Sequence, residues 1–249
     1  MTTLRCSAFL IAIIVYNFLG QSKSHAFDID VGYELFYGTQ LLDKGGEYFG
    51  DESAILQGVS IDFGDTGFGF DLGYRFSGSR GYVNKERIDY KLRYGSSVFE
   101  EERHQIDYGL GFIYHQHHRG EAVFEDFYEW EMSLAMPRLL PGSWTPSYTV
   151  AAEHALEDSI LDAGWWHRIA VDKVFQIEGV SPPLKFHADL AYRDGLGGIN
   201  AWTHSTFGLG ADFKLLENLV LSPNALYQVS LSDRLTDENV AAFVCHFAG

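Results

Sequence analysis

An alternation of apolar and polar residues recurs along most of this chain and constrains its fold more than any other feature. Between residues 68 and 76, aromatic residues and one leucine occupy the even positions, and Gly69, Asp71, Gly73 and Arg75 occupy the odd ones. Successive side chains of a β-strand point to opposite faces, so this pattern predicts a strand with one apolar and one polar face. The same alternation recurs in residues 27–37, 88–94, 106–114 and 184–192.

The length of these segments indicates the class of β-protein. Most of them run for 9 to 13 residues, whereas a tilted membrane strand needs roughly 9–11 residues and a strand of a globular protein averages about 5–6. We therefore predict an all-β fold, a single antiparallel up-and-down transmembrane barrel of about 12 strands, with 10 or 14 as the alternatives. The expected strands span residues 27–38, 54–63, 67–77, 86–95, 103–115, 123–136, 145–154, 164–176, 183–192, 201–215, 219–229 and 238–247.

The links between the expected strands alternate in length. Short links fall at 64–67, 177–182 and 216–218, and two of intermediate length fall at 96–102 and 137–144. An outer-membrane barrel has long loops outside the cell and short turns in the periplasm, so both termini are expected in the periplasm. The longer, polar links are 39–53, 77–85, 116–122, 155–163, 193–200 and 230–237.

Residues 1–26 are expected to be a cleavable secretory signal. Arg5 precedes an apolar run of about twelve residues, and Ser24-His25-Ala26 places small residues at the two positions that a signal peptidase reads. A transmembrane anchor is the rival interpretation, but a spanning helix needs roughly 20 apolar residues. The expected domain is therefore a barrel over residues 27–249 of a Gram-negative outer-membrane protein.

Charge and cysteine content exclude several classes of protein. Loss of Arg5 and Lys23 with the signal leaves 16 of the 18 basic residues against 34 acidic ones, a formal charge of −18. A chain this acidic is not expected to bind nucleic acid. Only Cys245 remains after cleavage, so no intramolecular disulfide can form, and a closed hydrogen-bonded barrel would supply the stability instead.

Aromatic residues cluster at the ends of the expected strands. Two rings of aromatic side chains at the membrane interfaces are typical of outer-membrane barrels, so outer-membrane lipid and lipopolysaccharide are the expected surroundings. Two places break the pattern, because Trp165-Trp166-His167-Arg168 does not alternate cleanly and Pro223 interrupts a strand, where it needs a bulge or a strand start. The strand-end aromatics are Phe27, Tyr37, Phe63, Phe68, Tyr94, Tyr114, Tyr148, Trp165, Phe175, Tyr192, Tyr227 and Phe247.

The end of the chain carries the first of two resemblances. Residues 240–249 resemble the C-terminal signal of outer-membrane proteins, an alternating strand that closes on an aromatic, although Phe247 is followed by Ala248 and Gly249. That resemblance implies recognition by the barrel-assembly machinery.

Three short motifs carry the second resemblance. They are the run from Tyr128 to Leu134, the Pro146-Ser-Tyr148 motif and the Gly164-Trp-Trp start. Together they look like a group of small proteobacterial barrels of uncharacterised function. These barrels are similar in plan to the twelve-stranded nucleoside-specific channel. The resemblance implies fold and location, and no residue of a nucleoside site carries over.

The polar faces of the expected strands bear charges of both signs. A charge facing hydrocarbon costs roughly 2–4 kcal/mol at the bilayer midplane, so these side chains are expected to face the lumen. Arg87, Lys91 and Arg93 share one strand and Glu129 with Glu131 another, which suggests a transverse field. The candidate pore-lining residues are Asp28, Asp30, Glu34, Asp71, Arg75, Arg87, Asp89, Lys91, Arg93, Glu129, Glu131, Arg168, Asp172, Lys185, Asp189 and Asp212.

Three other groups could carry chemistry, and each has a simpler interpretation. His115, His117 and His118 with Glu121 have a spacing that suits zinc or copper, but a solvated outer loop is expected there. His154, Glu157, Asp158 and Ser159 could form a hydrolytic site, but they share one loop and no G-x-S-x-G elbow is present. The acidic link with Asp43, Glu47, Asp51 and Glu52 lacks the spacing of a calcium loop. No metal or cofactor is expected.

The favoured hypothesis is a narrow passive channel for small solutes, because twelve strands enclose more space than side chains fill in barrels of about eight. One alternative is a lipid-modifying or hydrolytic barrel enzyme. Another is a structural barrel with a plugged lumen that acts through its outer loops. A soluble ligand-binding barrel is the remaining alternative of fold.

Overall fold

The computed structural model describes residues 28–43, 46–47, 49, 52–78, 86–117, 126–156, 163–179, 181–232 and 239–249. The predicted signal at 1–26 lies outside these residues, so its cleavage stays a prediction. Among the described residues, no helix has both the length and the apolar character needed to cross a membrane.

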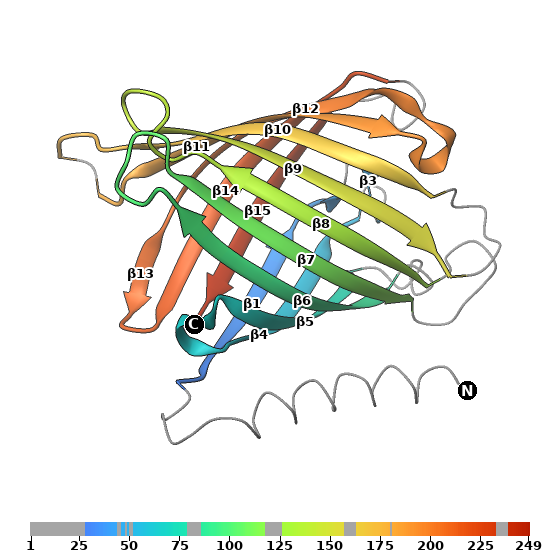
Figure 1. Cartoon of the computed structure of the whole chain (residues 1–249), viewed down its shortest axis with the longest axis horizontal. Helices are drawn as coiled ribbons and strands as arrows, with labels where there is room; N and C mark the ends of the chain where they lie inside the picture. Colours follow the sequence, from blue (N-terminus) through green and yellow to red (C-terminus); the bar gives the residue numbers. More distant parts are fainter. Residues whose placement is uncertain are drawn as a thin grey trace.

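Twelve strands of nine to twelve residues belong to one antiparallel sheet. Figure 1 shows how this sheet curls into a barrel. Each strand overlaps one of the expected segments. The strands are β1 (Asp30–Gly38), β4 (Ala54–Asp62), β5 (Phe68–Ser77), β6 (Arg87–Val98), β7 (Ile106–His117), β8 (Phe127–Ala135), β9 (Trp144–Ala155), β10 (Gly164–Phe175), β11 (Leu184–Asp194), β12 (Asn200–Ala211), β14 (Leu219–Ser230) and β15 (Val240–Ala248).

The sheet closes on itself. Neighbouring strands pair in chain order from β1 to β14, and the ring is completed by β15, which pairs with β14 on one side and with β1 on the other. The pairing of β12 with β14 closes the remaining gap, while the short β13 (Phe213–Leu216) continues from β12 and pairs with the start of β14. The predicted twelve-stranded barrel is therefore confirmed.

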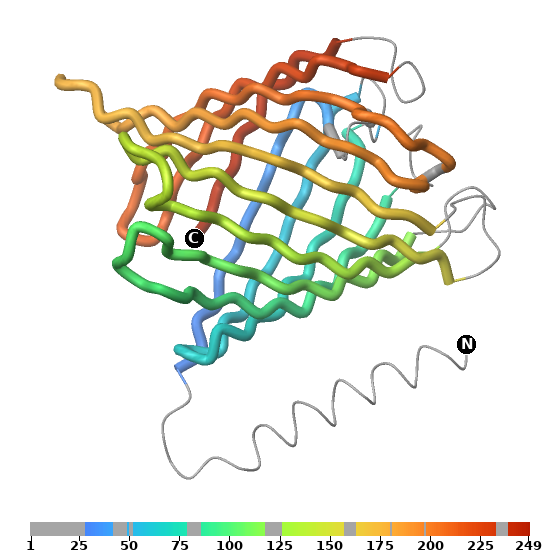
Figure 2. The backbone as a smooth tube through the Cα atoms, turned by 45° about the horizontal axis from the view of Figure 1, so that its top comes forward, coloured from blue at the N-terminus to red at the C-terminus, as the bar shows by residue number. Residues whose placement is uncertain are grey.

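The two ends of the barrel carry different links of the chain, as Figures 1 and 2 show. The start of β1 and the C-terminus lie at one end, together with the tight turn at 64–67. Gly67 adopts a φ of 76°, and a Cβ there would collide with the carbonyl oxygen of Gly95, so glycine is required. This end carries the links that were expected to be turns.

The link between β11 and β12 differs from the prediction. A long polar loop was expected at 193–200, but the strands continue to Asp194 and from Asn200, leaving only 195–199. The 3₁₀ turn Leu196–Gly198 folds Leu196 against Trp166 of the barrel interior, with Ala151 and Ala191 beside it. The apolar side chains of this link explain why it lies over the barrel wall.

The outward face of the barrel is apolar and exposed. Val31, Trp130, Ile169 and Leu209 all have half or more of their surface uncovered. A monomeric soluble protein rarely exposes an apolar surface of this extent, whereas an outer-membrane barrel turns such a band to lipid. The exposed apolar belt therefore indicates a membrane barrel.

Aromatic and polar groups border the belt at its two ends. Towards the loop end, the Tyr74 hydroxyl donates to Glu86 at 2.8 Å and the Tyr114 hydroxyl donates to Asp126 at 2.6 Å. At the turn end, the Lys173 ammonium lies 4.7 Å from the ring centroid of Trp144. Phenols and indoles with one wet and one apolar side suit the membrane interface.

The two irregular sequence motifs have local explanations. Trp165 is exposed on the outward face, whereas Trp166 is buried inside the barrel beneath Leu196. Pro223 is the fifth residue of β14 and lies between the stretch paired with β13 and the stretch paired with β12. A proline, which has no N–H to donate, is tolerated at such an interruption of the ladder.

Candidate functional site: the barrel lumen

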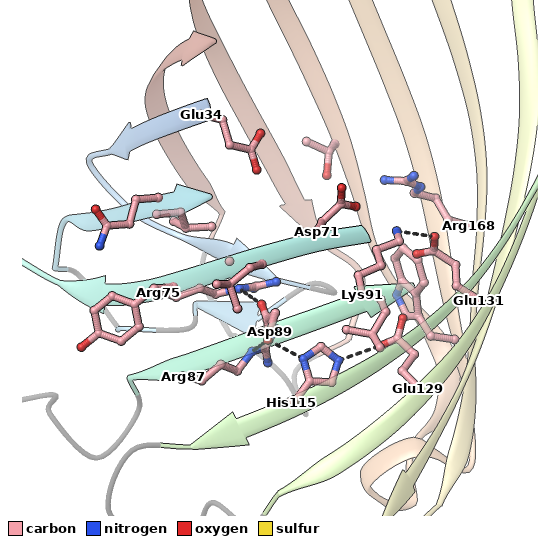
Figure 3. Close-up of a pocket in the computed structure, with 18 of the residues that line it drawn as sticks. Glu34, Asp71, Arg75, Arg87, Asp89, Lys91, His115, Glu129, Glu131 and Arg168 are labelled. Atoms are coloured by element: carbon pink, nitrogen blue, oxygen red, sulfur yellow. Dashed lines mark hydrogen bonds and ion pairs between the residues drawn. The ribbon is translucent and has the colours of Figure 1, made fainter. Parts of the chain in front are cut away.

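A cavity of ≈ 610 Å³ occupies the inside of the barrel, and residues of ten strands line it. Figure 3 shows that charged side chains converge on it from opposite walls. Its lining includes six carboxylates, from Glu34, Asp71, Asp89, Glu129, Glu131 and Asp189, and four permanent cations, from Arg75, Arg87, Lys91 and Arg168.

All ten of these residues belong to the predicted set of pore-lining candidates. The other six do not line this cavity. Arg93, Asp172, Lys185 and Asp212 take part in ion pairs elsewhere on the barrel wall. Asp28 and Asp30 lie at the start of β1, at the turn end. Whether any of them contacts a passing solute stays a prediction.

Asp89 of β6 is the hub of the charged wall. Its carboxylate accepts from Arg75 Nε and from Arg87 Nε, each at 2.7 Å. His115 Nδ1 lies 2.6 Å from the same carboxylate, and His115 Nε2 lies 3.4 Å from Glu129 Oε2. Register explains the cluster, because Asp89 lies between Gly73 of β5 and His115 of β7. A charge-assisted network of this kind fixes its members in place.

The side chains do not form the transverse field that was expected between the basic strand and the acidic strand. Lys91 of β6 pairs with Glu131 of β8 at 3.0 Å, so these opposite charges meet across β7 instead of facing each other across the lumen. Arg93 pairs with Asp62 at 2.7 Å and with Asp71 at 3.0 Å. The sequence prediction was wrong on this point, because Gly111 on the intervening β7 leaves room for the Lys91 side chain to reach Glu131.

A second polar cluster lies on β10, β11 and β12. His187 is held between two carboxylates, with Nδ1 at 2.7 Å from Asp172 and Nε2 at 3.0 Å from Asp189. Asp189 also accepts from the backbone N–H of Thr206 at 3.1 Å. The guanidinium of Arg168 lies over the ring of Trp166 at 5.4 Å, with no carboxylate of the described residues within ion-pair distance.

Histidines facing the lumen were missed at the sequence level. The link 116–122 was expected to be an outer loop, but β7 extends to His117, so His115 and His117 are buried strand residues. His118 and Glu121 lie outside the described residues. Within the described part of the chain, no cluster of His, Cys, Asp or Glu is arranged to hold a metal ion. The alternation of Tyr114, Gln116 and the histidines was the signal that the strand continues.

The second chemical candidate is divided between described and undescribed residues. His154 lies near the end of β9 and stacks on Tyr128 of β8, with ring centroids 5.1 Å apart. Tyr128 alternates with the buried, lumen-facing Glu129, so this stacked pair belongs to the outward face. Glu157, Asp158 and Ser159 lie outside the described residues, and a hydrolytic site there stays an untested alternative.

The lumen also has an apolar wall, formed by β1, β4, β14 and β15. Phe36, Leu56 and Val244 line a second cavity of ≈ 350 Å³, which shares Glu34 and Leu56 with the larger one. Phe36 and Leu56 pack against the buried Leu41 and Phe49, which belong to the link between β1 and β4. Leu41 and Phe49 of this first link therefore pack against the lumen wall, which was not expected.

Comparison with known proteins shows the fold. No protein-family model and no curated protein sequence matches the chain. Among solved structures, the NanC porin is 8% identical, with 88% of this chain and 98% of that chain covered and a TM-score of 0.50. The β domain of the Bordetella autotransporter BrkA is 14% identical, with coverage of 88% and 98% and a TM-score of 0.43. The translocator domain of NalP from Neisseria meningitidis is 11% identical, with coverage of 99% and 95% and a TM-score of 0.38.

The exposed apolar belt, the polar lumen and the match to the NanC porin agree with one another. The chain is a twelve-stranded bacterial outer-membrane β-barrel, similar in architecture to that porin.

Proposed function

We propose that this barrel is a narrow passive channel for small solutes across the outer membrane. The observation that carries the proposal is the ≈ 610 Å³ cavity inside a closed barrel, lined by residues of ten strands and by charged side chains from six of them. Barrels of about eight strands are filled by side chains, whereas twelve leave room for a water-filled path. Charged linings of this kind select among small solutes.

In this proposal the apolar belt contacts outer-membrane lipid, and the loop end faces lipopolysaccharide. No catalytic step is included, because selection by size and charge requires only the arrangement of the lining. The ion pairs along β5 to β8 hold long side chains against the wall and keep them from crossing the path.

The test is single-channel conductance of the barrel purified in detergent and inserted into a planar lipid bilayer. Discrete current steps are expected, and their size reports the narrowest part of the lumen. Heat-modifiable migration in gel electrophoresis, measured on the same sample, establishes that the barrel is folded. Sealed bilayers from a folded, inserted barrel would contradict the channel.

A further inference from the structure

The two cavities differ in the residues that line them, and the lining of the smaller cavity suits a defined class of ligand. It is lined by the apolar residues Phe36, Leu56 and Val244 and by the polar residues Glu34, Asn224 and His246. At ≈ 350 Å³ it falls within the range of small-molecule sites, which are mostly apolar with a few polar groups that orient the ligand. It adjoins the larger cavity through Glu34 and Leu56, so a solute in the lumen reaches it directly.

Glu34 is the charged group of this site that stays available. Its side chain is 60% exposed and lies 3.1 Å from His246, measured from Oε2 to Nε2. No Lys or Arg of the described residues lies within ion-pair distance of it. Of the four permanent cations of the larger cavity, Lys91 is engaged by Glu131 and both Arg75 and Arg87 by Asp89, whereas Arg168 of β10 has no carboxylate of the described residues within ion-pair distance.

This arrangement favours an organic cation over an anion. A carboxylate attracts an ammonium group, and the face of an aromatic ring such as Phe36 adds a cation–π contribution. The aliphatic side chains of Leu56 and Val244 would cover the apolar body of the same molecule. An anion with the same body would meet Glu34 with like charge, and the larger cavity also holds more carboxylates than permanent cations.

We propose that the Glu34 site binds small organic ammonium compounds with an aromatic or branched aliphatic body, and that the lumen prefers cations to anions. The inference deepens the proposed channel function and rests on it for the step from binding to passage. The binding itself requires only the cavity.

The test is titration calorimetry of the detergent-solubilised barrel with three probes at neutral pH. Benzylamine carries both the charge and the ring, methylammonium only the charge, and benzoate the ring with the opposite charge. Benzylamine is expected to bind at least about tenfold more tightly than either of the others, because methylammonium lacks the ring that the apolar side chains would cover and benzoate carries the same charge as Glu34.

Substitution then locates the site. Glu34→Gln removes the charge with little change of shape and is expected to weaken benzylamine binding about tenfold or more. Asp65→Asn is the matched control, because Asp65 is an exposed carboxyl of the turn Gly64–Thr66, outside the lumen. Equal binding of benzoate and benzylamine, or unchanged benzylamine affinity in Glu34→Gln, would overturn the proposal.

Conductance separates this inference from the channel itself. Current steps with a reversal potential that favours cations, together with benzylamine binding that depends on Glu34, support both. Current steps without such binding would support the channel function and contradict the proposed Glu34 site. Benzylamine binding without current steps would support the Glu34 site and contradict the channel function.

Discussion

Two parts of the lumen wall differ in whether their charged side chains are paired with opposite charges. On β5 to β8, Arg75, Arg87, Lys91 and Arg93 all contact carboxylates of the same wall. On β1, β4, β14 and β15, the lining includes Phe36, Leu56 and Val244, and Glu34 projects from it with His246 beside it and with no Lys or Arg of the described residues within ion-pair distance. The first wall satisfies its own charges, and the second keeps one charge available.

This difference teaches that the number of charged residues in a lumen is a poor guide to what the lumen binds. A charge that is already paired contributes rigidity and little attraction, because its field is largely cancelled by its partner. A carboxylate such as Glu34, which has no permanent cation of the described residues within ion-pair distance, remains able to attract a counter-charge. The walls should therefore respond differently to substitution.

The largest effect is expected at the hub of the charged wall. Asp89→Ala leaves Arg75, Arg87 and His115 without their shared acceptor, and breaking a buried ion pair in this way costs about 3–5 kcal/mol. The loss should appear as a lower midpoint in urea unfolding of the purified barrel. Asp30→Ala removes an exposed carboxylate from β1 and serves as control. Equal midpoints for the two variants would show that the wall does not depend on this hub.

A smaller, local effect is expected where the first link covers the apolar wall. Phe49 is fully buried against Leu41 and Ala54, and Phe49→Ala should lower the free energy that holds the link inward by about 3 kcal/mol. The amide of Thr39 donates to the Phe243 carbonyl at 2.9 Å, so its hydrogen exchange should become ~100-fold faster. Phe99→Ala, at an exposed site between β6 and β7, is the control and should leave Thr39 protected. Unchanged exchange would mean that the link is held by its backbone contacts alone.

The smallest effect on stability, with a distinct effect on selectivity, is expected at Glu131. Both members of its pair with Lys91 are partly exposed, so Glu131→Gln should change the free energy of unfolding by less than about 1 kcal/mol. It removes one lumen carboxylate and frees the Lys91 ammonium, so the reversal potential in a salt gradient should move towards anions.

The double variant Lys91→Gln with Glu131→Gln should return the reversal potential towards that of the unsubstituted barrel, because it removes both charges. A single variant with the original reversal potential would place this pair outside the conducting path.

Most of the fold was predictable from the sequence because strand alternation is a local property. The segments from 54 to 63 and from 164 to 176 became β4 and β10 within a residue at each end. Two of the misplaced boundaries, at His117 and at 193–200, lie where polar strand residues resemble loop residues. A histidine facing a polar lumen carries no apolar signal, so alternation loses its contrast there.

The site was predictable only in part, for a physical reason. Alternation indicates which face a side chain occupies, and it brought ten predicted residues to the cavity. It does not indicate which side chains meet across two or three strands, as Lys91 and Glu131 do. The inward fold of Phe49 was also hidden, because burial of a link residue depends on the wall it meets.

The seam between β1 and β15 has a consequence for assembly. Tyr33 and Gly249 exchange two backbone hydrogen bonds, at 2.7 and 2.9 Å, and β15 is bonded on both sides. In an open sheet the outer strands can fray one at a time, but a ring has no outermost strand. Losing β15 would uncover two edges at once, one on β14 and one on β1, so closure of the ring depends on both of its pairings.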